Sequence, residues 1–183
     1  PGAAPEPVFE SGGQLFVAGA GAAAPAPRAV AVGTDSDTAV RVLVGVATER
    51  GGDWLRVSPA DGQASASLSL ATTVSVDAAG LAPGLYRGRV SAAIPGGAMR
   101  SIPVTLVVRP AGACAPSEVF LAPVRPADGA AAVAGLPVGV EARLVDNCGM
   151  AVRSAGVAVE GGGFLRDFGP AADAAGGGEI FVG

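Results

Sequence analysis

Residues 84–108 decide the fold, and they read GLYRGRVSAAIPGGAMRSIPVTLVV. Two apolar runs, 85–92 and 101–108, lie on either side of Pro95-Gly96-Gly97. Glycine and proline favour turns, whereas valine, isoleucine, threonine and tyrosine favour strands. Two runs of this kind joined through a short glycine-containing segment predict an antiparallel β-hairpin.

The same alternation of short apolar runs and turn residues fills the first half of the chain. Further runs occupy residues 14–17, 28–32, 39–46, 54–59, 66–70 and 73–77. In the longest of these, the valines at 40, 42, 44 and 46 would share one face of a strand. About seven short strands in about 100 residues are typical of an immunoglobulin-like sandwich. No stretch keeps the apolar period of a helix, so the chain is predicted to be all-β.

Composition excludes several classes of function. The chain has no histidine, and histidine is the commonest general base and metal ligand. No GxSxG nucleophile motif is present. We therefore expect no catalysis, no cofactor and no metal. The basic residues are single scattered arginines and the net charge is -4, which argues against nucleic acid. No apolar run approaches the roughly 18–20 residues of a membrane-spanning helix, so no membrane insertion is expected.

The two cysteines predict one disulfide and an oxidising compartment. Cys114 and Cys148 are an even pair in a chain rich in glycine and proline. Residues 109–112 read RPAG and predict a short linker, which gives a first domain at 1–109 and a second at 113–183. Such a short linker would place the two domains end to end.

The second domain has too few strands for a complete immunoglobulin-like sandwich. Strand-like runs lie at 118–121, 137–145, 151–152, 156–159, 163–165 and 179–182. Two interpretations remain open. A longer natural chain continues beyond residue 183, or an open sheet edge is completed by a strand from another chain.

Three separated segments of the first half resemble the BACON family of bacterial immunoglobulin-like domains. They are WLRVSPADG at 54–62, VSVD at 74–77 with GLAPGLYRGRV at 80–90, and the closing IPVTLVV at 102–108. The second half is similar to bacterial secreted immunoglobulin-like repeats, through Cys114-Ala115-Pro116 and the segment 145–149. The resemblance implies a secreted or cell-surface module, and carbohydrate or mucin binding has been suggested for the BACON family.

The resemblance also gives Trp54 and Tyr86 a role. Both fall in the pattern of the family core, where they would supply bulk. The alternative is an exposed ligand platform for a sugar ring. Two pairs of oxygen-bearing side chains, the carboxylates of Asp35 and Asp37 and the carboxylate and amide of Asp146 and Asn147, suit turns, and the alternative for them is a Ca²⁺ site.

These observations favour a non-catalytic structural or interaction module outside the cell. Its expected partner is protein, either a copy of itself or another extracellular domain. One alternative is a glycan-binding module. The other is a filament subunit assembled by strand donation, with Val8-Phe9 as the donated segment and the second domain as acceptor.

Overall fold

The computed structural model describes residues 4–127, 139–152, 157–161, 164–170 and 180–182, and from residue 153 onward it describes the backbone alone. Every regular element among these residues is a strand, which confirms the all-β class. The strands are β1 Pro7–Phe9, β2 Gln14–Gly19, β3 Arg28–Thr34, β4 Val40–Thr48, β5 Leu55–Ser58, β6 Asp61–Ala64, β7 Leu70–Val76, β8 Gly84–Ala93, β9 Met99–Arg109, β10 Val119–Arg125, β11 Glu141–Asp146, β12 Val157–Gly161, β13 Phe164–Pro170 and β14 Ile180–Val182.

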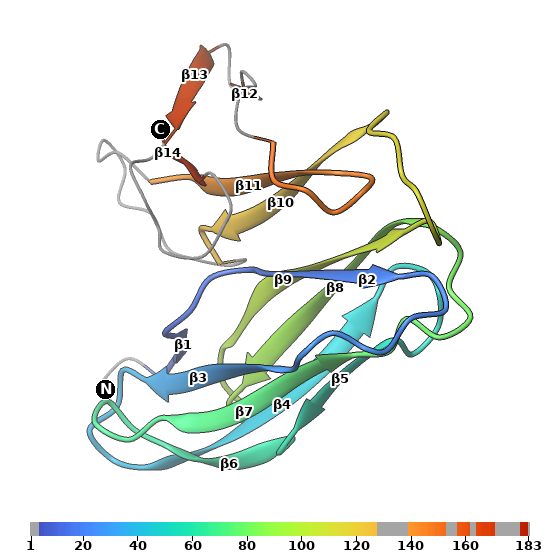
Figure 1. The fold of residues 1–183 in the computed structure, drawn as a ribbon. Helices are drawn as coiled ribbons and strands as arrows, with labels where there is room; N and C mark the ends of the chain where they lie inside the picture. Colours follow the sequence, from blue (N-terminus) through green and yellow to red (C-terminus); the bar gives the residue numbers. More distant parts are fainter. Residues whose placement is uncertain (1–3, 128–138, 153–156, 162–163, 171–179, 183) are drawn as a thin grey trace.

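The first nine strands form two sheets that pack face to face (Figure 1). One sheet has the order β1-β3-β7-β5 and the other has the order β2-β9-β8-β4-β6. The predicted hairpin is confirmed, because β8 and β9 pair antiparallel from Gly84 opposite Val108 to Ala93 opposite Met99. It lies at the centre of the second sheet, so the stretch that predicts the fold also forms its longest pairing.

Two chain segments pass from one sheet to the other at the lateral edges of the sandwich. On one side β1 pairs with β3, and after residues 10–13 the chain continues as β2, parallel to β9. On the other side β5 pairs with β7, and only Pro59-Ala60 separate it from β6, which pairs with β4. The edge strands β1, β5 and β6 are therefore three or four residues long, and short edges give another chain little to pair with.

Alternation along the strands fills the space between the two sheets with apolar side chains. Valine dominates this core, as β-branched residues suit a pleated surface. Val46, the fourth valine of β4, is 38% exposed and lies beyond the core. The buried hydrophobic residues of the cluster are Phe16, Ala18, Val30, Val32, Val42, Val44, Trp54, Leu55, Ala64, Val74, Val76, Ala78, Tyr86, Val90, Ala92, Ile94, Ile102, Val104, Leu106 and Val108.

Three segments differ from the sequence-based expectation. The Asp61-Gly62 pair, a combination that favours turns, lies in β6 because it pairs with Leu43 and Val42 of β4. Residues 66–69 were expected in a strand and instead form a loop, in which the N–H of Ser65 donates to the carbonyl of Leu68. Val8-Phe9, which the filament alternative donates to another chain, lie in β1 and pair with β3 of the same chain. For Asp61-Gly62, pairing with a distant strand overrides local preference.

The second half of the described chain forms a third sheet, with the order β10-β11-β14-β13-β12. Ala142 and Leu144 of β11 are two positions apart in the strand-like run at 137–145, and both are buried. Val152 returns beside Leu144 through an N–H···O=C bond of 3.1 Å. Val138 lies outside the described residues. The division into domains at 1–109 and 113–183 stays a prediction.

Candidate functional site: the junction between the sandwich and the third sheet

Trp54 and Tyr86, the candidate ligand platform, are both inside the sandwich. Their side chains are 2% and 7% exposed. The rings meet edge to face, with 6.4 Å between centroids and 69° between planes. Neither ring presents a face to solvent, so these two residues form part of the core, as the resemblance implied.

The polar atoms of both rings bond to nearby backbone. The indole N–H of Trp54 donates to the carbonyl of Arg50 at 2.9 Å, and the hydroxyl of Tyr86 donates to the carbonyl of Ala82 at 2.8 Å. A tyrosine near the start of this strand, bonded to backbone a few residues upstream, is the tyrosine corner of immunoglobulin-like sandwiches. The guanidinium of Arg50 covers the outer side of the Tyr86 ring, 4.8 Å from its centroid.

The predicted disulfide between Cys114 and Cys148 is confirmed. It joins the linker before β10 to the turn after β11. Asn147 reinforces this link, because its side-chain carbonyl accepts the N–H of Ser117 at 2.8 Å and that of Glu118 at 3.2 Å. A disulfide is typical of proteins that fold in an oxidising compartment outside the cytosol.

Of the candidate carboxylates, one stabilises a turn and another binds the N-terminal segment of the chain. Asp146 accepts N–H groups of Cys148 and Met150 at 2.9 and 2.8 Å, which is the expected turn chemistry. Asp35 instead accepts the N–H of Glu6 at 2.7 Å, from a segment 29 residues away. Asp37 lies in the same exposed loop as Asp35.

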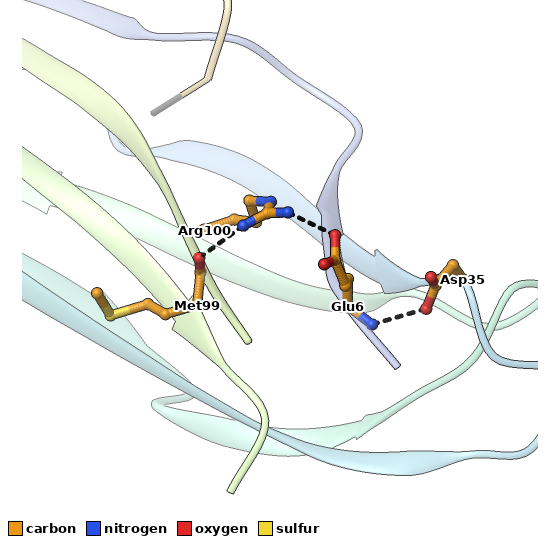
Figure 2. Close-up of polar contacts among 4 residues, drawn as sticks. All are labelled: Glu6, Asp35, Met99 and Arg100. Carbon is orange, nitrogen blue, oxygen red and sulfur yellow. Dashed lines mark hydrogen bonds and ion pairs between the residues drawn. The ribbon is translucent and has the colours of Figure 1, made fainter. Parts of the chain in front are cut away.

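The Asp35 contact belongs to a polar clasp of Glu6, Asp35 and Arg100 (Figure 2). The carboxylate of Glu6, just before β1, accepts a hydrogen bond from Arg100 of β9 at 2.5 Å. The clasp joins the two sheets at the end of the sandwich where the chain enters. It fixes the N-terminal strand to its own sandwich.

Close backbone contact joins the sandwich to the third sheet. The N–H of Gly13 donates to the carbonyl of Val124 in β10 at 2.8 Å. A Cβ on Gly13 would lie 2.1 Å from the carbonyl oxygen of Pro123, and one on Gly12 would lie 2.5 Å from that of Val124. Only glycine permits this approach at either position.

A third glycine makes a similar contact from the turn after β11. Gly149 has a φ of 80°, and a Cβ there would lie 2.3 Å from Cγ1 of Val17. Thr105 and Val107 alternate with the core residues of β9 and so point to the outer face of their sheet, yet they are 2% and 0% exposed. Figure 1 shows β10 and β11 lying beside β2 and β9, so the third sheet covers this outer face.

Two grooves border this junction. The larger, of about 540 Å³, lies over the outer face of β4, β8 and β9 and is lined by Glu49, Arg89 and Ser101 among others. None of the described residues that line it is aromatic. The smaller, of about 380 Å³, lies between the start of β3 and the third sheet and holds Arg28 and Arg143. Partial burial and the charge of Arg143 lower the pKa of Arg28.

Sequence reasoning missed this junction. Ser11-Gly12-Gly13 has the composition of an ordinary turn, and nothing in a glycine's neighbours along the chain reveals a contact with residues 123 and 124. The two arginines of the smaller groove are 115 positions apart and belong to no recognisable motif.

The sheet orders define the class of protein. The order β1-β3-β7-β5, together with β9-β8-β4 in the facing sheet, corresponds to the two sheets of an immunoglobulin-like sandwich. The tyrosine corner at Tyr86 agrees with this class. Among the described residues, no helix is long and apolar enough to cross a membrane.

Comparisons with known proteins do not identify a particular family. No family of known domains matches the sequence, and no curated protein matches it. Among solved structures, the CupB2 chaperone of Pseudomonas aeruginosa is 12% identical with a TM-score of 0.43, over 93% of this chain and 87% of that one. The Escherichia coli chaperone DraB is 14% identical with a TM-score of 0.42, over 78% and 91%.

A GH5 xyloglucanase of Bacteroides ovatus, in complex with a XXXG heptasaccharide, is 12% identical with a TM-score of 0.41. That likeness covers 57% of this chain, which spans 19% of the length of the xyloglucanase chain. These TM-scores are all below 0.5, so the class stated above rests on the sheet orders of this chain.

Proposed function

We propose that the chain is a non-catalytic structural module of a secreted or cell-surface bacterial protein, which holds two units at a fixed angle and presents their outer faces to protein partners. The BACON-type resemblance, which spans residues about 8–108, supports this proposal. The observation that carries it is the junction at Gly12, Gly13 and Gly149, where backbone contacts leave no room for a side chain.

The packing at the junction favours a fixed angle over a flexible tether. Domains joined by a short linker move relative to one another unless their interface is substantial and apolar. Here Ala122 and Val124 of β10 are 1% and 7% exposed, and Thr105 and Val107 on the facing strand are similarly buried. Relative rotation would expose these side chains and break the bond between Gly13 and Val124.

The strand-donation alternative has less support. Residues 7–9 and 14–19, which contain the segment expected to be donated, already pair with β3 and β9 of the same chain. Phe16 is 2% exposed within this chain's own core. Donation to another copy would first require that this pairing be lost. The glycan-binding alternative remains a prediction, and none of the described residues that line the larger groove is an aromatic residue that would favour it.

Backbone ¹⁵N relaxation on the whole chain tests the proposal. If the angle is fixed, amides of the sandwich and of β10–β11 will give one common rotational correlation time. Replacing Gly13 by alanine places a Cβ against the carbonyl oxygen of Pro123, so the variant will show two different correlation times.

Gly45→Ala is the matched control. Gly45 lies in β4 with no atom within 4 Å of an added Cβ, so this variant will tumble as one body. Independent tumbling of the two units in the unmodified chain, or unchanged relaxation in Gly13→Ala, would contradict the proposal.

A further inference from the structure

The smaller groove at the junction carries two positive charges that no described carboxylate neutralises. The ion pairs among the described residues join Arg41, Arg100 and Arg125 to carboxylates, and they do not include the arginines at 28 and 143. Arg28 and Arg143 both line one groove of about 380 Å³. Like charges held together in a partly desolvated site are unfavourable unless an anion joins them.

The two arginines come from opposite sides of the junction, and the guanidinium of Arg28 is positioned by an aromatic ring. The guanidinium of Arg28 lies over the ring of Phe16, 5.1 Å from its centroid. Phe16 is itself fixed in the core at 2% exposure, so this cation–π contact orients the arginine from below. Arg143 extends from β11 of the third sheet, and its Nε is buried with no hydrogen-bond partner in the described part of the chain. A buried N–H donor without an acceptor indicates a missing one.

The remaining lining determines what kind of anion fits. Leu15, Val17 and Ala26 contribute apolar surface, and Pro25 and Pro27 lack the N–H donors that a loop usually offers. A sugar presents several hydroxyls, which would find few partners on this lining, and a phosphate carries up to two charges that the apolar part of the lining would desolvate. A carboxylate presents two oxygens to the fork of a guanidinium, and an apolar body attached to it would match the proline and leucine surface.

We propose that this groove binds the carboxylate of a small ligand with an apolar body, held by Arg28 and Arg143. The carboxylate can be that of a free organic acid or the end of a peptide chain. Because each arginine comes from a different unit, the site exists only when the junction is formed. The proposal concerns binding alone, and no bond is made or broken.

Titration of the whole, ¹⁵N-labelled chain with sodium hexanoate tests the proposal. Hexanoate will move the amide signals of Ala26, Arg28 and residues 143–145, and hexanamide, which has the same body without the charge, will bind at least about tenfold more weakly. A tetrapeptide with a free carboxyl end, compared with its C-terminal amide, will show whether a chain end serves as well as a free acid.

Substitutions locate the site. Arg28→Gln and Arg143→Gln will each weaken hexanoate binding about tenfold or more, because each removes one charge-assisted donor. Arg56→Gln, at an exposed position of β5, is the matched control and will bind as the unmodified chain does. Overlaid amide spectra away from the groove will show that each variant is folded.

Three results would overturn the proposal. The first is that hexanamide binds as well as hexanoate. The second is that both arginine variants bind hexanoate as well as the unmodified chain does. The third is that none of the four probes moves signals at the groove when its concentration is 20 times about 1 mM. If only the peptide with a free carboxyl end binds, the groove is still a carboxylate site, and its ligand is the end of a peptide chain.

Discussion

Reduction of the Cys114–Cys148 disulfide is expected to destabilise the third sheet and leave the sandwich intact. The bridge closes a loop with a sequence separation of 34 residues, entirely C-terminal to β9. In the chain-entropy description, closing such a loop stabilises the folded state by about 4 kcal/mol. A five-stranded sheet with few buried side chains among its described residues depends strongly on a contribution of this size.

The chain contains its own reporter for this experiment. Trp54 is the only tryptophan and lies in the sandwich core, 2% exposed. Its fluorescence therefore follows the sandwich, while far-ultraviolet circular dichroism follows all three sheets. Under reducing conditions, the midpoint of the part of the dichroism transition that belongs to the third sheet will move to a urea concentration lower by more than about 1 M. The midpoint of the fluorescence transition will move by no more than a few tenths of 1 M.

The double variant Cys114→Ala/Cys148→Ala controls for other effects of the reductant. It will behave as the reduced chain does, and adding reductant to it will change nothing further. If the fluorescence and dichroism transitions move together by the same amount, the sandwich and the third sheet unfold as one unit. The loop-entropy reasoning applied to the third sheet alone would then be refuted.

Three further outcomes are expected. Tyr86→Phe leaves the carbonyl of Ala82 without its donor and will lower the free energy of unfolding of the sandwich by about 1 kcal/mol, measured by urea titration. Glu6→Gln breaks the pair with Arg100, and since Glu6 is 46% exposed the loss will stay below about 1 kcal/mol and shrink in 1 M salt. Deletion of residues 1–17 removes Phe16 from the core and will abolish cooperative unfolding measured by circular dichroism. A monomer that still unfolds cooperatively would contradict this expectation.

The sequence predicted the sandwich well where the pattern is local. The hairpin follows from the turn residues Pro95-Gly96-Gly97 between two strand-forming runs. The disulfide follows from the presence of one pair of cysteines. The strand at 61–64 did not, since Asp61-Gly62 favours a turn in isolation and is held extended only by pairing with β4. Strand ends and edges depend on neighbours far along the chain, and these neighbours are invisible to a local pattern.

The candidate site was beyond prediction for the same reason. Gly13 has the local signature of a turn, and its importance arises from Pro123, which is 110 residues away. Arg28 follows Pro27 at the start of a strand, and no nearby residue indicates that Arg143 will lie in the same groove. Sites built between two units join residues that share no spacing, so they become visible only after both units are placed.

The edges of the sandwich and the junction with the third sheet have a common physical origin. A β-sandwich leaves unpaired N–H and C=O groups along its lateral edges, and these groups invite pairing with other chains. Here three of the four edge strands are three or four residues long, and the fourth, β2, has β10 beside it. The bond from Gly13 to Val124 meets the chain where β1 ends and β2 has not yet begun. The passage of the chain from one sheet to the other thus leaves a short edge strand and the N–H of Gly13, to which the third sheet is bonded. Gly13→Ala will therefore disturb the junction while leaving the pairing of β8 with β9 unchanged.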